Sequence, residues 1–402
     1  MLALLVFANA LDAPALDGAL VAAYATTLDG KPIFARNESI RVMPASNQKL
    51  LTAAFALDTL GPDGRQATRI WKEHDRTVVQ AEGDPLLSRD ELLELDLDRS
   101  KPVSVVQAYA PGIPGGWEHD DLKDKYAASV YALSVDRGAF ELWGERGKPQ
   151  LRPAPYGVKI ERKEGEKLDW SYDPFARKLL VTGPIPEKAA RIDTLATPRA
   201  DFAAASLLGR SPRTATEVPS RMPDIVLPGH TVAESVAACL PPSDNNIAEH
   251  LLLDGAGKFG PLGNDPYAVA APRLRNFLER IVGTPFADVL PVDGSGLARQ
   301  NLVTVRAMNA LLRWADKQQT RELWRSSLAK GGAPGTLRNR LANVSFWGKT
   351  GSLSRVAALS GYLKRSDGTE IVVSVIVNHY AASDTEVRAA MDAWVRELGG
   401  KQ

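Results

Sequence analysis

Three short segments of this chain carry residue types that together can cleave an amide bond. Ser46-Asn47-Gln48-Lys49 places a serine three positions before a lysine, and a helix would bring both side chains onto one face. Ser243-Asp244-Asn245 adds a second hydroxyl and an amide, and Lys349-Thr350-Gly351 sets a cation beside a hydroxyl. Such a set can attack an amide next to a free carboxylate without a histidine, because lysine can act as the base.

The surroundings of Ser46 distinguish it from a chance match. A bare serine-x-x-lysine is expected about once in a chain of this length, and Ser327-Leu328-Ala329-Lys330 is such a match. The glycine-rich residues 331–335 follow it at once and would end any helix there. Ser46 instead precedes an apolar stretch that stops at Gly61-Pro62, which predicts a helix over about 46–60. We therefore favour Ser46 as the nucleophile.

Other chemistries are disfavoured by their sequence context. The glycine pattern at residues 255–260 follows a helical rather than a strand pattern, which argues against a dinucleotide site. Ser295 is preceded by Asp293-Gly294 and lacks the G-x-S-x-G elbow of Ser-His-Asp hydrolases. The five histidines show no metal-binding spacing, and a single cysteine, Cys239, excludes an intrachain disulfide and a multi-cysteine zinc site. We expect neither a metal nor a cofactor.

Composition indicates an ordinary globular protein of two or three domains. The chain has 402 residues, 44% hydrophobic and 24% charged. A net charge of +1 gives no electrostatic reason to expect a nucleic acid partner. No apolar stretch reaches the roughly 18 residues of a transmembrane segment. Residues 1–10, MLALLVFANA, end in a small-x-small triplet, which predicts a signal-peptide remnant and an extracytoplasmic location; an apolar N-terminal strand is the alternative.

The pattern along the chain predicts a split catalytic domain with an insertion. Residues 19–36 have the pattern of a β-hairpin around Asp29-Gly30. Short β-like runs separated by glycine, proline and charged residues fill 67–226, and we interpret this region as one or two small, mostly β inserted domains. Helical patterns return near residue 230, and two strands and an amphipathic helix close the chain. The catalytic domain is thus expected over 11–66 and 227–402.

Beyond the three segments, longer stretches of the chain resemble one known family. The chain is similar to the class C low-molecular-mass penicillin-binding proteins, the D-alanyl-D-alanine carboxypeptidases and endopeptidases of bacterial cell walls. The matching stretches are PASNQKLLTAAFALDTLG (44–61), GDP (83–85), GWEHDDLKDKYAASVYALSV (116–135), SDNNIAEHLLL (243–253), DGSGLARQNLVT (293–304), GTLRNRL (335–341) and GKTGSLSRVAALSGYL (348–363). In this family a long interval between the first two motifs holds inserted domains, as expected here for 67–226.

The resemblance implies a penicillin-binding, serine β-lactamase-like α/β (α+β) fold, with an antiparallel sheet covered by helices on both faces. It implies that Ser46 attacks the penultimate D-alanine carbonyl, with Lys49 as base. Ser243 would relay the proton to the leaving amine, and Asn245 would hold either the backbone amide of the substrate or Lys49. Lys349, Thr350, Gly351 and Ser352 would bind the substrate, Lys349 and Thr350 at its terminal carboxylate and Ser352 through a backbone N–H at the oxyanion. The expected partners are peptidoglycan stem peptides, with β-lactams as covalent inhibitors.

Two alternatives share this fold. A serine β-lactamase of class A would need a deacylating glutamate in an E-x-x-L-N loop, and no such pentapeptide lies between residues 246 and 348. A non-catalytic peptidoglycan-binding protein is disfavoured by the intact Ser46 and Lys49. The sequence thus favours a D,D-peptidase.

Overall fold

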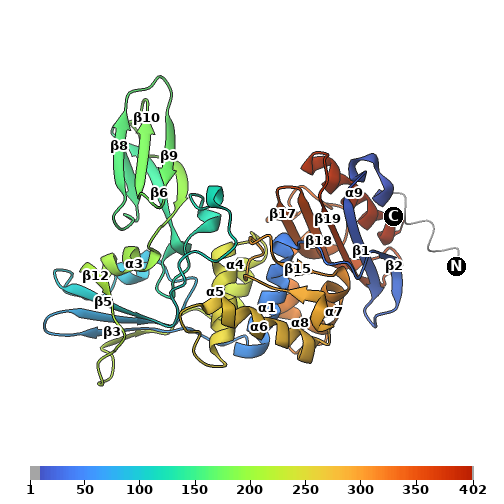
Figure 1. The fold of residues 1–402 in the computed structure, drawn as a ribbon, viewed down its shortest axis with the longest axis horizontal. Helices are drawn as coiled ribbons and strands as arrows, with labels where there is room; N and C mark the ends of the chain where they lie inside the picture. The colour runs from blue at the N-terminus through green and yellow to red at the C-terminus, as the bar shows by residue number, and fades with distance from the viewer. Residues whose placement is uncertain (1–9, 401–402) are drawn as a thin grey trace. The chain divides into compact units, whose positions relative to one another are not determined.

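Six strands form an antiparallel sheet that joins the two ends of the chain (Figure 1). The structure, a computed structural model, describes residues 10–400. The strands lie in the order β16 (Ala329–Lys330), β17 (Phe346–Leu353), β18 (Val356–Lys364), β19 (Glu370–Asn378), β1 (Leu20–Thr27) and β2 (Pro32–Arg36). β1 and β2 form the predicted hairpin, and β1 pairs with β19 from Leu20 opposite Asn378 to Thr27 opposite Ile371.

Helices cover both faces of this sheet. α9 (Asp384–Gly399) begins with a capping box at Ser383 and packs on one face, where Trp394 is fully buried and meets the ring of Phe34 edge-on at 5.3 Å. Alternate residues of β19, such as Val373 and Val375, point into this core. α7 (Val305–Ala315) contributes nothing to that core and contacts β1 and β19 from the opposite face. The sheet with helices on both faces agrees with the predicted fold class.

The chain around the sheet divides into two compact units. The first contains the residues up to Pro62, Val232–Ala256 and the chain from Ala268 onward. The remaining elements that lie wholly or mostly in this unit are η2 (Ala10–Asp12), η3 (Pro14–Leu16), η4 (Ala45–Asn47), α1 (Gln48–Leu60), α4 (Val232–Cys239), α5 (Asn245–Gly257), α6 (Pro266–Phe277), η8 (Leu278–Val282), η9 (Phe286–Asp288), β14 (Val289–Leu290), β15 (Leu302–Val303) and α8 (Arg321–Ser326).

The second unit contains Asp63–Thr231 and Gly257–Tyr267. Its strands make a five-stranded sheet and two three-stranded sheets, and none of its described strands enters the six-stranded sheet. The elements are β3 (Thr68–Lys72), β4 (Thr77–Ala81), α2 (Arg89–Leu93), β5 (Pro102–Gln107), η5 (His119–Asp121), η6 (Lys125–Ala127), η7 (Asp136–Gly138), β6 (Ala139–Glu145), β7 (Lys148–Arg152), β8 (Lys159–Lys163), β9 (Asp169–Asp173), β10 (Lys178–Thr182), β11 (Ala190–Ala196), α3 (Ala200–Leu208), β12 (Arg210–Thr214) and β13 (Ile225–Leu227).

The two units differ from the expected domains in three segments, 63–66, 227–231 and 257–267. All three were expected in the catalytic domain, and all three group with the second unit. No residue pattern in the longest of them, 257–267, indicates to which of the two units it belongs. The expected signal-peptide remnant over residues 1–10 falls, except for Ala10, outside the described residues.

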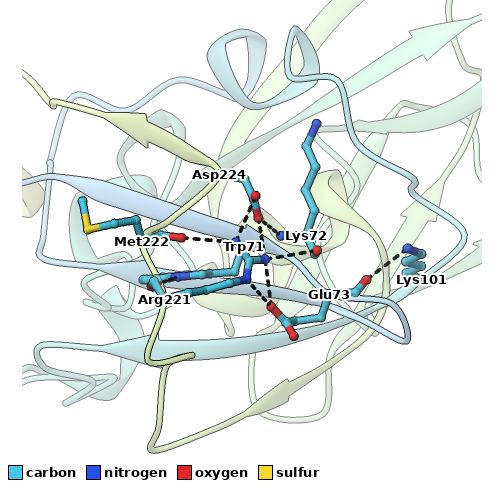
Figure 2. Close-up of polar contacts among 7 residues, drawn as sticks. All are labelled: Trp71, Lys72, Glu73, Lys101, Arg221, Met222 and Asp224. Atoms are coloured by element: carbon cyan, nitrogen blue, oxygen red, sulfur yellow. Dashed lines mark hydrogen bonds and ion pairs between the residues drawn. The ribbon is translucent and has the colours of Figure 1, made fainter.

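An exposed cluster of charged residues fixes the edge strand of the five-stranded sheet (Figure 2). Arg221 donates to the carboxylates of both Asp224 and Glu73, and its backbone carbonyl accepts from the indole of Trp71 at 2.9 Å. Asp224 also accepts from the backbone N–H of Lys72. The segment leading into β13 is thereby tied to β3, its neighbour in the sheet.

The helix that carries the lysine begins later than predicted. The sequence predicts one helix from residue 46, but Ala45–Asn47 form a 3-10 turn and α1 starts at Gln48. Ala45, directly before the serine, has φ 46°, a left-handed conformation that is costly for alanine. Strain of this kind tends to occur where the fold forces a functional residue into one position.

Among the described residues, no helix is both long enough and apolar enough to cross a membrane.

Candidate active site

The side chains of Ser46, Lys49 and Asn245 meet in the first unit. Nζ of Lys49 lies 2.9 Å from Oγ of Ser46 and 2.6 Å from Oδ1 of Asn245. Its third neighbour is the backbone carbonyl oxygen of Ser295, at 2.8 Å. The 3-10 turn and the first turn of α1 place the serine and the lysine on one face, as their spacing predicts. Asn245 and Ser295, which are distant from α1 in the sequence, complete the set of groups around Lys49.

These three neighbours determine what a neutral Lys49 can do. The amide oxygen of Asn245 and the carbonyl of Ser295 can only accept hydrogen bonds. They therefore take the two N–H groups of a neutral amine, and the nitrogen lone pair points at Ser46. Ser46 is the one neighbour with a proton to give. The geometry thus suits transfer of the Ser46 hydroxyl proton to Lys49.

Strand β17 packs against the backbone of the nucleophile. A Cβ added to Gly351 would lie 2.8 Å from the carbonyl oxygen of Pro44 and 3.0 Å from the amide nitrogen of Ser46. Only glycine lets the strand approach this closely. On the same strand Lys349 is fully buried and donates to the carbonyl of Thr350 at 2.8 Å. Ser352 is exposed, and its hydroxyl accepts from Arg388 at 3.1 Å.

The second predicted motif lies in the turn between α4 and α5. Ser243 has φ 66°, and the backbone N–H of Asp244 donates to the carbonyl of Cys239 at 2.9 Å. Asp244, rather than Asn245, caps α5 by accepting from the backbone N–H of Ile247 at 3.0 Å. Asn245 is thereby left to contact Lys49. Ser243 precedes it by two residues in the same turn.

Burial dominates the electrostatics of the two site lysines. Desolvation lowers the pKa of Lys49 from its usual 10.5, against the attraction of Asp293, Glu249 and Asp244. Desolvation also lowers the pKa of Lys349 well below that value, and the charge of Lys49 adds to the effect. Two neighbouring buried ammonium groups disfavour each other, so protonation of one lysine favours the neutral form of the other.

Two acidic residues near Lys49 and the carbonyl of Ser295 carry no signal in the local sequence pattern. Glu249 and Asp293 are both fully buried and bind backbone amides of the segment 293–298. Ser295 contributes a carbonyl, which every residue type carries, so its identity gave no signal. The stretch DGSG (293–296) does resemble the family, and this resemblance was the one indication that the segment belongs to the site. In the other serine-x-x-lysine match, the hydroxyl of Ser327 donates to the carbonyl of Leu323, and Lys330 is exposed on β16.

The fold and this arrangement define a serine acyl-transfer site of the penicillin-binding type. The sequence profile of the D-Ala-D-Ala carboxypeptidase 3 (S13) family matches residues 5–196 and 231–398, and the chain belongs to that family. It is therefore a serine-type peptidase of the D-alanyl-D-alanine carboxypeptidase class.

Two known proteins illustrate this similarity. A D-alanyl-D-alanine carboxypeptidase of Actinomadura sp. is 28% identical over 98% of this chain and 84% of its own length. The crystal structure of penicillin-binding protein 4 (dacB) from Haemophilus influenzae superposes with a TM-score of 0.81 at 19% identity, covering 98% of each chain. The same protein complexed with a β-lactam gives a TM-score of 0.73.

Proposed function

We propose that Ser46 is the acylated nucleophile of a D,D-peptidase that acts on peptidoglycan stem peptides. The observation that carries this proposal is the contact of Lys49 with Ser46 Oγ, with two acceptor-only groups occupying the other positions around Nζ. In the first step Lys49 takes the hydroxyl proton and Oγ bonds to the carbonyl carbon of the penultimate D-alanine. The developing oxyanion accepts from the backbone N–H groups of Ser46 and Ser352.

The tetrahedral intermediate then collapses with loss of the leaving amine. The proton that Lys49 took passes through the hydroxyl of Ser243 to this amine, and the C–N bond breaks to leave an ester on Ser46 and a neutral Lys49. Asn245 holds Lys49 and the backbone amide of the substrate. Water then attacks the ester, the Ser46 oxygen takes back a proton, and the free acid departs.

Lys349 and Thr350 bind the terminal carboxylate of the substrate or of a β-lactam. A bound carboxylate favours the charged form of Lys349. Because the two lysine charges oppose each other, a charged Lys349 favours neutral Lys49. Binding of the correct end group therefore prepares the base. Gly351 belongs to this substrate-binding strand and permits its approach to Ser46.

The expected place of action is outside the cytoplasm, where peptidoglycan lies. This follows from the substrate and from the small-x-small triplet at Ala8–Ala10. An N-terminal sequence of the mature protein recovered from its host would test the signal peptide. Cleavage after Ala10 is the expected result, and a mature chain that retains residues 1–10 would contradict it.

Labelling with a fluorescent penicillin tests the nucleophile. Wild-type protein should be labelled, Ser46→Ala should not, and the matched control Ser327→Ala should label as wild type does. Labelling of Ser46→Ala would refute the assignment. Digestion of monomeric and cross-linked muropeptides then separates the two activities. Loss of a terminal D-alanine indicates carboxypeptidase action, and cleavage of the cross-link indicates endopeptidase action.

A further inference from the structure

A buried carboxylate of α5 holds the loop that supplies the third neighbour of Lys49. Glu249 is fully buried, and its two oxygens accept from the backbone N–H groups of Gly294 at 2.9 Å and Ser295 at 2.8 Å. A carboxylate that accepts through both oxygens has the hydrogen-bonding pattern of the ionised form. A buried carboxylate is costly unless hydrogen-bond donors surround it. The two backbone N–H groups are such donors, and both belong to the loop next to Lys49.

The peptide groups of this loop are each held from two sides. The 293–294 peptide accepts from Gln48 at its carbonyl and donates to Glu249 at its N–H. The 294–295 peptide accepts from Thr52 at 2.7 Å and also donates to Glu249. Side chains of α1 thus bind the carbonyls while the carboxylate binds the amides.

The next peptide group repeats this pattern at the catalytic lysine. The carbonyl of Ser295 accepts from Lys49, and the N–H of Gly296 donates to Asp293 at 2.7 Å. Gly296 has φ +83°, and a Cβ there would overlap the carbonyl oxygen of Ala45. The loop is therefore held in one conformation against the nucleophile turn, with the Ser295 carbonyl directed at Lys49.

We propose that Glu249 is a positioning residue for proton transfer: it fixes the Ser295 carbonyl that turns the lone pair of Lys49 toward Ser46, and it supplies a negative charge to that lysine. The inference rests on the proposed roles of Ser46 and Lys49. Without the carboxylate, the 293–294 and 294–295 peptides lose their N–H acceptor, while the peptide that carries the Ser295 carbonyl keeps its contact with Asp293. The Ser295 carbonyl then holds its direction less strictly, and with it the amine of Lys49.

Because Glu249 carries a negative charge, its removal should change the pH dependence of the acylation constant. Lys49 faces the acidic groups Glu249, Asp293 and Asp244, and its own charge, after burial, lowers the pKa of the neighbouring Lys349. Cys239 is also nearby, but burial raises its pKa to about 12, so its thiol is neutral at physiological pH.

Removal of one negative charge lowers the pKa of Lys49, because the ammonium form loses an attraction. The acid limb of the acylation profile, where Lys49 must lose its proton, then moves to lower pH.

The test compares second-order acylation constants for a fluorescent penicillin across pH in three variants. Glu249→Gln should lower the plateau of the acylation constant about tenfold to a hundredfold. It should also move the acid limb of its pH profile to lower pH. Thr52→Val removes the contact to the Gly294 carbonyl without a change of charge, and should lower the plateau with the acid limb unmoved. Asp392→Asn is the matched control, a buried carboxylate that pairs with Arg340. It should lower the melting temperature only.

The outcomes separate this inference from the proposed function. If wild-type protein is not acylated at Ser46, the proposed function fails. The positioning role is refuted if wild-type protein is acylated and Glu249→Gln keeps both the wild-type plateau of the acylation constant and the wild-type position of the acid limb. It is also refuted if the acylation constant of Glu249→Gln falls only as far as its folded fraction falls. Should Glu249→Gln not fold, Thr52→Val decides, since a wild-type plateau in that variant would refute the role of the loop.

Discussion

Replacing Gly351 with alanine tests how closely the substrate-binding strand must approach the nucleophile. The new Cβ would lie 2.8 Å from the carbonyl oxygen of Pro44 and 3.0 Å from the amide nitrogen of Ser46, and both are backbone atoms. To restore van der Waals separation the two backbones must part by roughly half an ångström. Misplacement by about 1 Å can cost a hundredfold in rate, so we expect a loss of about tenfold or more in the acylation constant.

Time-resolved acylation by a fluorescent penicillin measures this loss, and a thermal melt confirms that the variant is folded. Gly399→Ala is the matched control, because its Cβ would meet only Leu363 at 4.0 Å, an ordinary contact. That control should acylate at the wild-type rate. A folded Gly351→Ala protein that acylates as fast as wild type would show that the close approach of β17 does not position Ser46.

Three further predictions concern the carboxylate site, the insertion and the surface cluster. Lys349→Ala should slow acylation by carboxylate-bearing β-lactams about tenfold or more. Near wild-type acylation rates in this variant would contradict a role of Lys349 at the substrate carboxylate. Excision of residues 63–231 with a short linker should leave penicillin acylation intact while altering the preference between cross-linked and monomeric muropeptides; a folded but unlabelled product refutes this. Arg221 lowers the pKa of Asp224 from 3.8 to about 2, so the stability from this pair is present above roughly pH 4 and is lost as the pH falls through about 2. Asp224→Asn should abolish that part of the acid dependence in melts, and an unchanged profile argues against it.

The chemical groups of the site follow from local sequence. Ser46 and Lys49 share a face because they are three residues apart at the start of a helix, and this holds whether the first turn is α or 3-10. The β1–β2 hairpin and α9 likewise follow from turn residues and periodicity, since these patterns operate over a few residues. Stretches resembling the penicillin-binding family then indicated which distant motifs belong together.

Tertiary structure alone decided how Lys49 is oriented and charged. The carbonyl of Ser295 contacts Lys49 from 246 residues further along the chain. The carboxylate of Glu249 acts on the lysine through its charge and through the Ser295 amide that it binds. A backbone acceptor has no residue-type signature, and a glutamate in a helix is ordinarily a solvated side chain. Burial also lowers the pKa values of Lys49 and Lys349, and burial depends on which elements pack over a residue. Local sequence thus determines which residue types are available for chemistry. The protonation state and the orientation of the Lys49 amine depend on long-range contacts that no local pattern encodes.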